Sequence, residues 1–209
     1  MKKKYNDIYL HLDKLFPNPK CELNYFNDYS LLIAIMLSAQ TTDKRVNEVT
    51  NVLFNKYKSL SDLANASLDE LKQIIYPLGN YNKKALNVKM IAEILFNEYD
   101  GVVPNNRIVL EKLPGVGHKT VNVFFSEYFN IPAFAVDTHV ERVSKRLSLV
   151  CNDDNVNKIE NVLMKNTMKD EWGRRHLQMV LFGRYICKAK NPLCDECQLE
   201  KICSFKNLK

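Results

Sequence analysis

Glycine and proline are scarce in this chain of 209 residues, with 6 and 7 copies. Their scarcity excludes a collagen-like protein and a linker protein rich in proline and glycine. Long apolar runs are also missing. The longest, Leu31–Leu37, is far shorter than the roughly 20 residues that a helix needs to cross a bilayer. We therefore expect no membrane as a partner.

The amino terminus carries little that would direct export. Lysines follow Met1, but Asp7 and Asp13 fall where a signal peptide is apolar. We therefore expect a cytoplasmic protein whose thiols stay reduced. Six cysteines are present, and four of them lie between residues 187 and 203. In a reducing compartment such a cluster favours metal ligation over a disulfide framework.

Composition and charge indicate a folded protein with an anionic partner. Hydrophobic residues make up 46% of the chain, which excludes a mainly disordered protein. The 30 basic and 24 acidic residues give a net charge of +6. This modest excess favours association with a polyanion, although it says nothing about the fold.

Apolar residues recur at helical spacing along the chain. Residues 46–57 and 88–99 each place them three or four positions apart, on one face of a helix. The segment 31–39 is apolar on all sides, which predicts a buried helix. Ser67 and Glu70 match a capping box, in which each side chain accepts from the backbone N–H of the other residue. No useful stretch alternates between apolar and polar residues, so we predict an all-α fold.

The four clustered cysteines are Cys187, Cys194, Cys197 and Cys203. Four thiolates can hold a zinc ion or an iron–sulfur cluster. A zinc ribbon usually pairs two C-x2-C knuckles, whereas only Cys194 and Cys197 form one here. This asymmetry favours a cluster, with zinc as the nearer alternative and buried cysteines without a metal as the remoter one.

The loop after the first of these cysteines carries Lys188 and Lys190. A loop that is fixed by a metal and presents lysines can grip phosphates. Solvated surface charge explains the two lysines equally well, and the sequence leaves both interpretations open.

The segment Leu113–Thr120 reads Leu-Pro-Gly-Val-Gly-His-Lys-Thr and lies between two predicted helices. Gly115 and Gly117 permit positive φ and leave the backbone amides unobstructed. The second helix is expected to begin near His118, so that its free N–H groups form an anion site suited to a DNA phosphate. An isolated G-x-G is most often only a turn, but the flanking residues strengthen the signal.

Two residues have side chains suited to catalysis. Lys119 falls in the first turn of the second helix, where a cation is unfavourable, and a nucleophilic lysine benefits from such a site. A lysine that only contacts phosphate is the alternative. Asp137 precedes an amphipathic helix, where an aspartate ordinarily serves as the N-cap. Taken by itself, the sequence favours the capping role for Asp137.

Together these motifs resemble the endonuclease III family, iron–sulfur DNA glycosylases and AP lyases of the helix-hairpin-helix superfamily. The segments 113–120, 136–139 and 187–203 occur in the order and spacing of that family. A fourth segment, residues 37–43, resembles the family's DNA-facing segment. The resemblance extends over residues 5–206.

The resemblance implies a two-lobed all-α fold with a cleft between the lobes. Residues 23–133 would form a six-helix barrel that contains the helix-hairpin-helix at about 107–129. Residues 1–22 and 134–209 would form the second lobe. The four cysteines of the loop 187–203 would hold a [4Fe–4S] cluster with a structural and DNA-positioning role.

The implied activity is that of a bifunctional DNA glycosylase/AP lyase of base excision repair that removes oxidised pyrimidines. Lys119 would attack the sugar and form a Schiff base, and Asp137 would stabilise the positive charge that grows on the sugar. β-Elimination would then cleave the strand 3′ to the abasic site. The partner would be double-stranded DNA with a damaged pyrimidine or an abasic site. We expect a monomer that associates with the nucleoid through this DNA.

The resemblance also implies DNA contacts. Gln40 corresponds to the residue that fills the space left by the flipped base. Glu111 resembles a residue of the family's cleft, although a glutamate on a helix surface is the simpler interpretation. The remaining implied contacts are Ser38, Gly115, Gly117, His139, Lys188 and Lys190.

Two implied contact positions depart from the family pattern. Asn80 stands in Gly79-Asn80-Tyr81-Asn82 where the family commonly has a wedge leucine, which predicts weaker stacking or altered reading of the opposite base. His118 replaces an arginine, which removes a fixed charge and predicts pH-dependent DNA affinity.

Two other functions remain as alternatives. A monofunctional adenine or thymine mismatch glycosylase shares the hairpin, the aspartate and the cluster, but lacks a lysine at the position of Lys119. A non-enzymatic iron–sulfur DNA-binding module would have no nucleophile, so Lys119 also argues against it.

Overall fold

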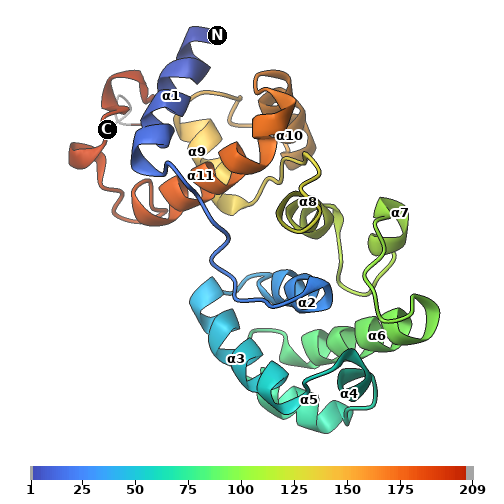
Figure 1. Ribbon diagram of the computed structural model, residues 1–209. Coiled ribbons are helices and arrows are strands. Elements are labelled where there is room, and N and C mark those ends of the chain that lie inside the picture. Colours follow the sequence, from blue (N-terminus) through green and yellow to red (C-terminus); the bar gives the residue numbers. More distant parts are fainter. Residues whose placement is uncertain (1, 206–209) are drawn as a thin grey trace. The chain divides into compact units, whose positions relative to one another are not determined.

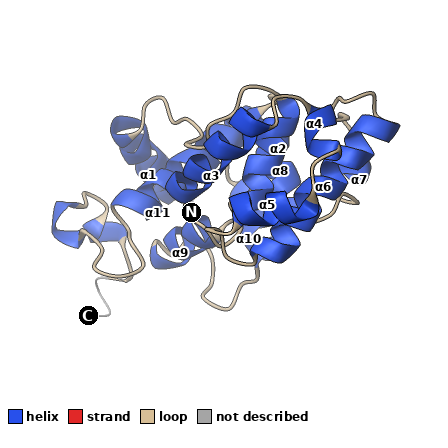
Figure 2. Ribbon diagram, turned by 90° about the horizontal axis from the view of Figure 1, so that it is seen from below, coloured by secondary structure: helices blue, strands red, loops and turns tan. Residues whose placement is uncertain are grey.

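The computed structural model describes residues 2–205, and every regular element in that range is a helix (Figure 2). The predicted all-α fold is therefore confirmed. The chain forms two compact units: one comprises residues 22–130, and the other combines the segment up to residue 21 with the segment from residue 131 onward. None of the described helices is long and apolar enough to span a membrane.

The unit of residues 22–130 is built around α2 (Asp28–Leu37), in which Tyr29 to Leu37 are all buried. A helix that is apolar on all sides must be enclosed by others, and α2 packs against α3, α6 and α8 (Figure 1). The predicted buried helix is therefore confirmed for Leu31–Leu37, whereas Ser38 and Ala39 belong to the turn that follows it. The other helices of this unit are α3 (Asp43–Lys56), α4 (Leu60–Ala64), α5 (Leu68–Ile75), α6 (Tyr81–Glu98), α7 (Arg107–Leu110) and α8 (His118–Glu127).

Only half of the predicted capping box forms at the start of α5. The Ser67 side chain accepts a hydrogen bond from the Glu70 backbone N–H, as expected. The Glu70 carboxylate instead accepts from the Tyr57 hydroxyl at 2.8 Å and pairs with Lys56 at 3.1 Å. Two side-chain donors on the neighbouring α3 segment thus replace the backbone donor.

The second unit encloses a separate apolar core. Tyr5, Ile8 and Leu12 line the core-facing side of α1 (Lys2–Leu15). The long helix α11 (Trp172–Tyr185) packs against both α1 and α9 (Thr138–Arg146) (Figure 1). The remaining elements are α10 (Val156–Lys165) and the short 3₁₀ turns η1 (Lys169–Glu171), η2 (Cys194–Glu196) and η3 (Glu200–Ile202).

An ion pair between a buried arginine and a half-buried aspartate joins α1 to α11 in this unit. Arg175 is 8% exposed, and its guanidinium contacts Asp13 at 2.5 Å. Gln178 also donates to Asp13, at 3.0 Å. Burial alone would raise the pKa of the Asp13 carboxyl, but the hydrogen bonds from Arg175 and Gln178 hold it below its usual value. The first helix is therefore fixed by charge as well as by apolar packing.

Candidate functional site

The predicted hairpin is a tight turn between α7 and α8. Val116 donates its backbone N–H to the Leu113 carbonyl at 3.1 Å, and the Val116 side chain is buried. Gly115 has φ +76°, and a Cβ added there would lie 2.3 Å from Asn87 Nδ2. Both the backbone angle and the space therefore require glycine at this position.

Gly117 serves a different purpose from Gly115, because its φ is −103° rather than positive. It is the N-cap of α8, and extended backbone is usual for an N-cap. Gly115 thus uses the positive φ that glycine permits, whereas Gly117 does not. Nothing lies within 4 Å of a Cβ added at Gly117, and Gly117 makes no side-chain cap. The backbone at the start of α8 is therefore sterically accessible to an anion.

Lys119 is exposed and is the second residue of α8, which begins at His118 as predicted. The side chain thus extends from the positive end of the helix. The same first turn that is accessible to an anion also carries the candidate nucleophile.

His118 belongs to a polar network that links α7 to α8. Its Nδ1 lies 3.3 Å from Glu111 Oε1, and its Nε2 lies 3.2 Å from Asn122 Nδ2. Arg107 bonds Glu111 at 3.3 Å and Asn122 at 2.8 Å. Nδ1 can donate to Glu111 while Nε2 accepts from Asn122. Glu111 therefore supports the hairpin.

Asp137 caps α9 through one carboxylate oxygen. Its Oδ1 accepts the backbone N–H groups of His139 at 2.9 Å and of Val140 at 2.8 Å. The capping role favoured by the sequence is thereby confirmed. Because two amides hold Oδ1, the carboxylate of this half-buried residue has a fixed orientation.

His139 lies where α9 and α11 approach closely, since a Cβ added at Gly183 would be 2.9 Å from His139 Cβ. Arg142 Nη2 lies 3.0 Å from His139 Nδ1 and donates to the Gly183 carbonyl at 2.7 Å. Burial lowers the pKa of the His139 imidazole. Arg142 can only donate, so Nδ1 of His139 accepts, and the neutral ring carries its proton on Nε2.

The four cysteines follow α11 in a loop that packs partly against the core of this unit. All four are free and half-buried. Cys197 lies close enough to the other three thiols for their charges to act on it. Four thiols that meet in one loop can hold a metal ion or an iron–sulfur cluster.

Two arginines of α9 secure the cysteine loop. Arg142 Nε donates to the Cys187 carbonyl at 3.1 Å, and Arg146 contacts Cys187 Sγ at 3.4 Å. Arg146 also donates to the carbonyls of Lys188 and Ala189 at 2.7 and 3.2 Å. Lys188 and Lys190 themselves are exposed, and so the backbone of this segment is held while both lysines face solvent.

Two further turns hold the remaining candidate DNA contacts. Ser38 ends α2 and donates its hydroxyl to the Ile35 carbonyl at 2.8 Å. Gln40 and Asn80 are both exposed, and each has φ 56°. Asparagine adopts this left-handed conformation more readily than leucine does, so the turn itself favours Asn80 over the family's wedge residue.

Sequence reasoning missed Lys84, whose side chain is buried beneath the turn that carries Gln40. The signal was available: Lys84 shares one helical face with Val88, Ile91 and Leu95, all of them buried. A lysine in an apolar stripe indicates a buried partner elsewhere in the fold.

Comparisons with known proteins agree with this geometry. A family model described as HhH-GPD superfamily base excision DNA repair protein matches residues 33–169. Endonuclease III of Bacillus subtilis is 47% identical over 195 residues, covering 92% of this chain and 89% of that protein. Endonuclease III of Rickettsia felis is 41% identical, covering 97% and 94%.

Solved structures of DNA glycosylases are similar over nearly the whole chain. A trapped covalent intermediate of endonuclease III with DNA superposes with a TM-score of 0.96 at 46% identity, covering 100% of this chain and 98% of that one. A thermostable thymine-DNA glycosylase superposes with a TM-score of 0.86 at 25% identity, covering 99% and 98%. On the strength of both sequence and structure, the chain belongs to the endonuclease III family.

Proposed function

We propose that this chain is a bifunctional DNA glycosylase/AP lyase of base excision repair that removes oxidised pyrimidines from double-stranded DNA. The observation that carries the proposal is the first turn of α8. There an exposed lysine, Lys119, directly follows a hairpin whose Gly117 leaves open space for a phosphate at the positive end of the helix. A phosphate held at this turn brings the sugar of the same strand to the lysine.

The chemistry begins with a flipped nucleotide, because the glycosidic bond cannot be reached inside the base stack. The neutral Lys119 amine forms a bond to C1′, and the base leaves with the electron pair of the glycosidic bond and takes up a proton. Ring opening gives a Schiff base between Lys119 and C1′. Loss of a C2′ proton then expels the 3′ phosphate by β-elimination, and water hydrolyses the imine to release the enzyme.

Asp137 would act on the first of these steps. A carboxylate stabilises the positive charge that develops on the sugar as the base departs, and it can accept a proton from Lys119. The two amides that hold Oδ1 fix the orientation of the carboxylate before the substrate arrives. Such preorganisation lowers the cost of reaching the transition state.

A [4Fe–4S] cluster on Cys187, Cys194, Cys197 and Cys203 fits the mutual proximity and partial burial of these thiols. When bound, it supplies no step of base removal, and its contribution is to fix the loop. The exposed Lys188 and Lys190 would then meet the DNA backbone from a rigid support. Metal analysis of protein purified without oxygen should find iron, and zinc without iron would overturn this assignment.

The proposed function is tested with borohydride trapping and base release across a panel of duplexes carrying different oxidised pyrimidines. Borohydride reduces a Schiff base to a stable adduct, so a bifunctional enzyme gives both a released base and a covalent complex. Base release without an adduct would instead indicate a monofunctional glycosylase. Neither product from any lesion would indicate a DNA-binding module.

A further inference from the structure

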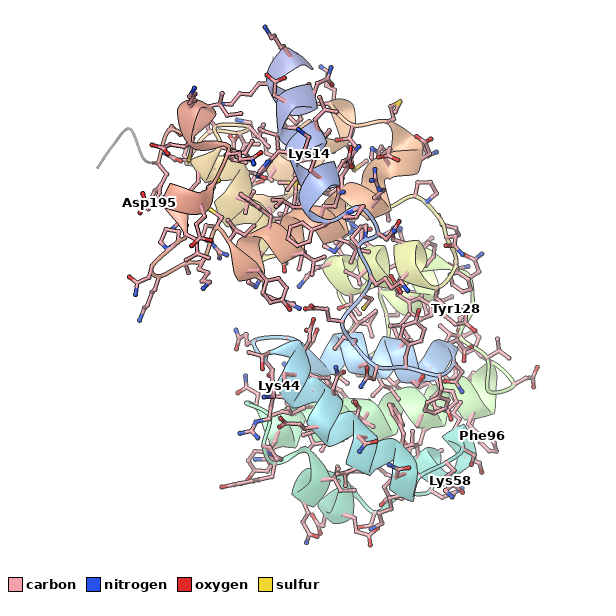
Figure 3. The ribbon with its side chains drawn as sticks, turned by 60° about the vertical axis from the view of Figure 1, so that its left-hand side comes forward. Lys14, Lys44, Lys58, Phe96, Tyr128 and Asp195 are labelled. Atoms are coloured by element: carbon pink, nitrogen blue, oxygen red, sulfur yellow. The ribbon has the colours of Figure 1, made fainter. Side chains whose placement is uncertain are left out.

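Lys84 is a buried lysine that holds the turn between α2 and α3. Its side chain comes from the first turn of α6, and the residue is 6% exposed. Its Nζ donates to the Ala39 carbonyl and to Thr41 Oγ1, both at 2.9 Å. These two acceptors flank Gln40, so the lysine grips the turn on both sides of it. α3, which begins directly after this turn, carries the labelled Lys44 (Figure 3).

Both acceptors of Lys84 are uncharged oxygen atoms, and each takes one N–H of the amine. Burial lowers the pKa of this amine. The Thr41 hydroxyl in turn donates to the Ala39 carbonyl at 3.4 Å, which leaves Oγ1 to accept from Lys84. The turn is thus held by a closed set of hydrogen bonds.

The same residue is also joined to the second candidate turn. The Lys84 backbone N–H donates to the Asn80 carbonyl at 3.0 Å, in the first hydrogen bond of α6. Lys84 is therefore tied to Asn80 through its backbone and to the residues flanking Gln40 through its side chain. Because Gln40 and Asn80 both have φ 56°, each turn is strained and needs support from its surroundings.

A third turn is supported one helical turn further along α6. Asn87 is 9% exposed, and its amide occupies the space beside Gly115 of the hairpin. One face of α6 thus carries Asn80 at its start, then Lys84 and Asn87, and each of these positions meets a different candidate DNA-contact turn.

We propose that Lys84 is a positioning residue that fixes the Gln40 turn relative to the Asn80 turn, so that both reach the same opened base pair. The proposal rests on the proposed function, because it assigns these turns to DNA. Lys84 itself does not touch the substrate in this account. Its loss should leave general DNA affinity in place and remove the preference for a duplex in which a base is missing.

Lys84→Met tests the proposal, with Lys89→Met as a matched control. Lys89 lies on the same helix and donates to two carbonyls, of Ala64 and Ala66, each at 3.1 Å, but the turn it holds has no assigned DNA contact. The probe is a duplex containing a tetrahydrofuran abasic analogue, compared with its undamaged counterpart. The discrimination ratio is the Kd for the undamaged duplex divided by the Kd for the abasic duplex. In Lys84→Met this ratio should fall about tenfold, because two hydrogen bonds are lost. Lys89→Met should retain the parent ratio.

A double-mutant cycle with Gln40→Ala separates positioning from general loss of structure. If Lys84 acts through Gln40, the double variant should prefer the abasic duplex over the undamaged one no less than the poorer single variant does. Additive losses would overturn the proposal, as would an equal loss in Lys89→Met. Should Lys84→Met fail to fold, Thr41→Val removes one acceptor and should reduce the ratio by about threefold.

The trapping reaction of the parent distinguishes failure of this proposal from failure of the proposed function. A parent that forms no borohydride adduct contradicts the proposed function itself. If the parent forms the adduct and Lys84→Met keeps its full preference for the abasic analogue, the positioning role alone is wrong.

Discussion

The amide of Asn87 fills the space that any side chain at Gly115 would need. The added Cβ would stand 2.3 Å from Asn87 Nδ2 and 3.3 Å from Met36 Cγ. Met36 of the buried helix α2 and the buried Asn87 side chain thus pack against the hairpin at Gly115. The hairpin has no room to shift toward them.

Gly115→Ala should lower the free energy of unfolding by about 2–4 kcal/mol, because it combines positive φ with overpacking. Gly117→Ala is the matched control, since its φ is ordinary and its surroundings are open. It should cost less than about 0.5 kcal/mol while weakening DNA binding, because the methyl group obstructs the phosphate. Urea unfolding measures the loss of stability, and DNA titration measures the loss of affinity. Equal unfolding midpoints for the two variants would contradict a special structural requirement for glycine at position 115.

Asp137→Asn should separate capping from catalysis. Asparagine caps helices about as well as aspartate, so the unfolding free energy should change by less than about 0.5 kcal/mol. The lost charge should slow base release roughly 100-fold or more. Single-turnover kinetics and urea unfolding provide the measurements. Unchanged turnover in a stable variant would leave Asp137 with capping as its one role.

The Asp13–Arg175 pair should contribute to stability at neutral pH and fail in acid. The pKa of Asp13 is lower in the folded protein than in the unfolded chain. Its contribution is therefore fully present above the unfolded value of about 3.9 and is lost as pH falls through the folded value. Asp13→Asn should lower the urea midpoint more at pH 7 than at pH 3. If the urea midpoints of the parent and Asp13→Asn differed by the same amount at both pH values, the charge of Asp13 would not contribute to stability as described.

Asn80→Leu restores the family's usual wedge residue at a strained position. Leucine is disfavoured at φ 56°, so the substitution should cost about 1 kcal/mol of stability. The larger apolar surface should strengthen stacking and shift the preference for the base opposite the lesion. Single-turnover rates with each of the four opposite bases test this. If neither affinity nor preference changes, Asn80 has no wedge role.

Local patterns predicted much of the fold, because helix periodicity and N-cap chemistry act over a few residues. The α2 segment and the Asp137 cap are examples. The failures came from partners distant in sequence. The Glu70 carboxylate accepts from Tyr57 instead of from the Ser67 backbone. Lys84 donates to Ala39 and Thr41, which lie more than 40 residues away in the sequence. Periodicity marks such positions as unusual but cannot identify what they contact.

The proposed reaction depends most directly on Lys119 as the residue that bonds to DNA. The decisive measurement is mass spectrometry of the borohydride adduct after proteolysis. We expect the nucleotide remnant on the peptide that contains Lys119, and no adduct from Lys119→Gln. A remnant on another lysine, or trapping of Lys119→Gln to the same extent as the parent, would contradict the assignment.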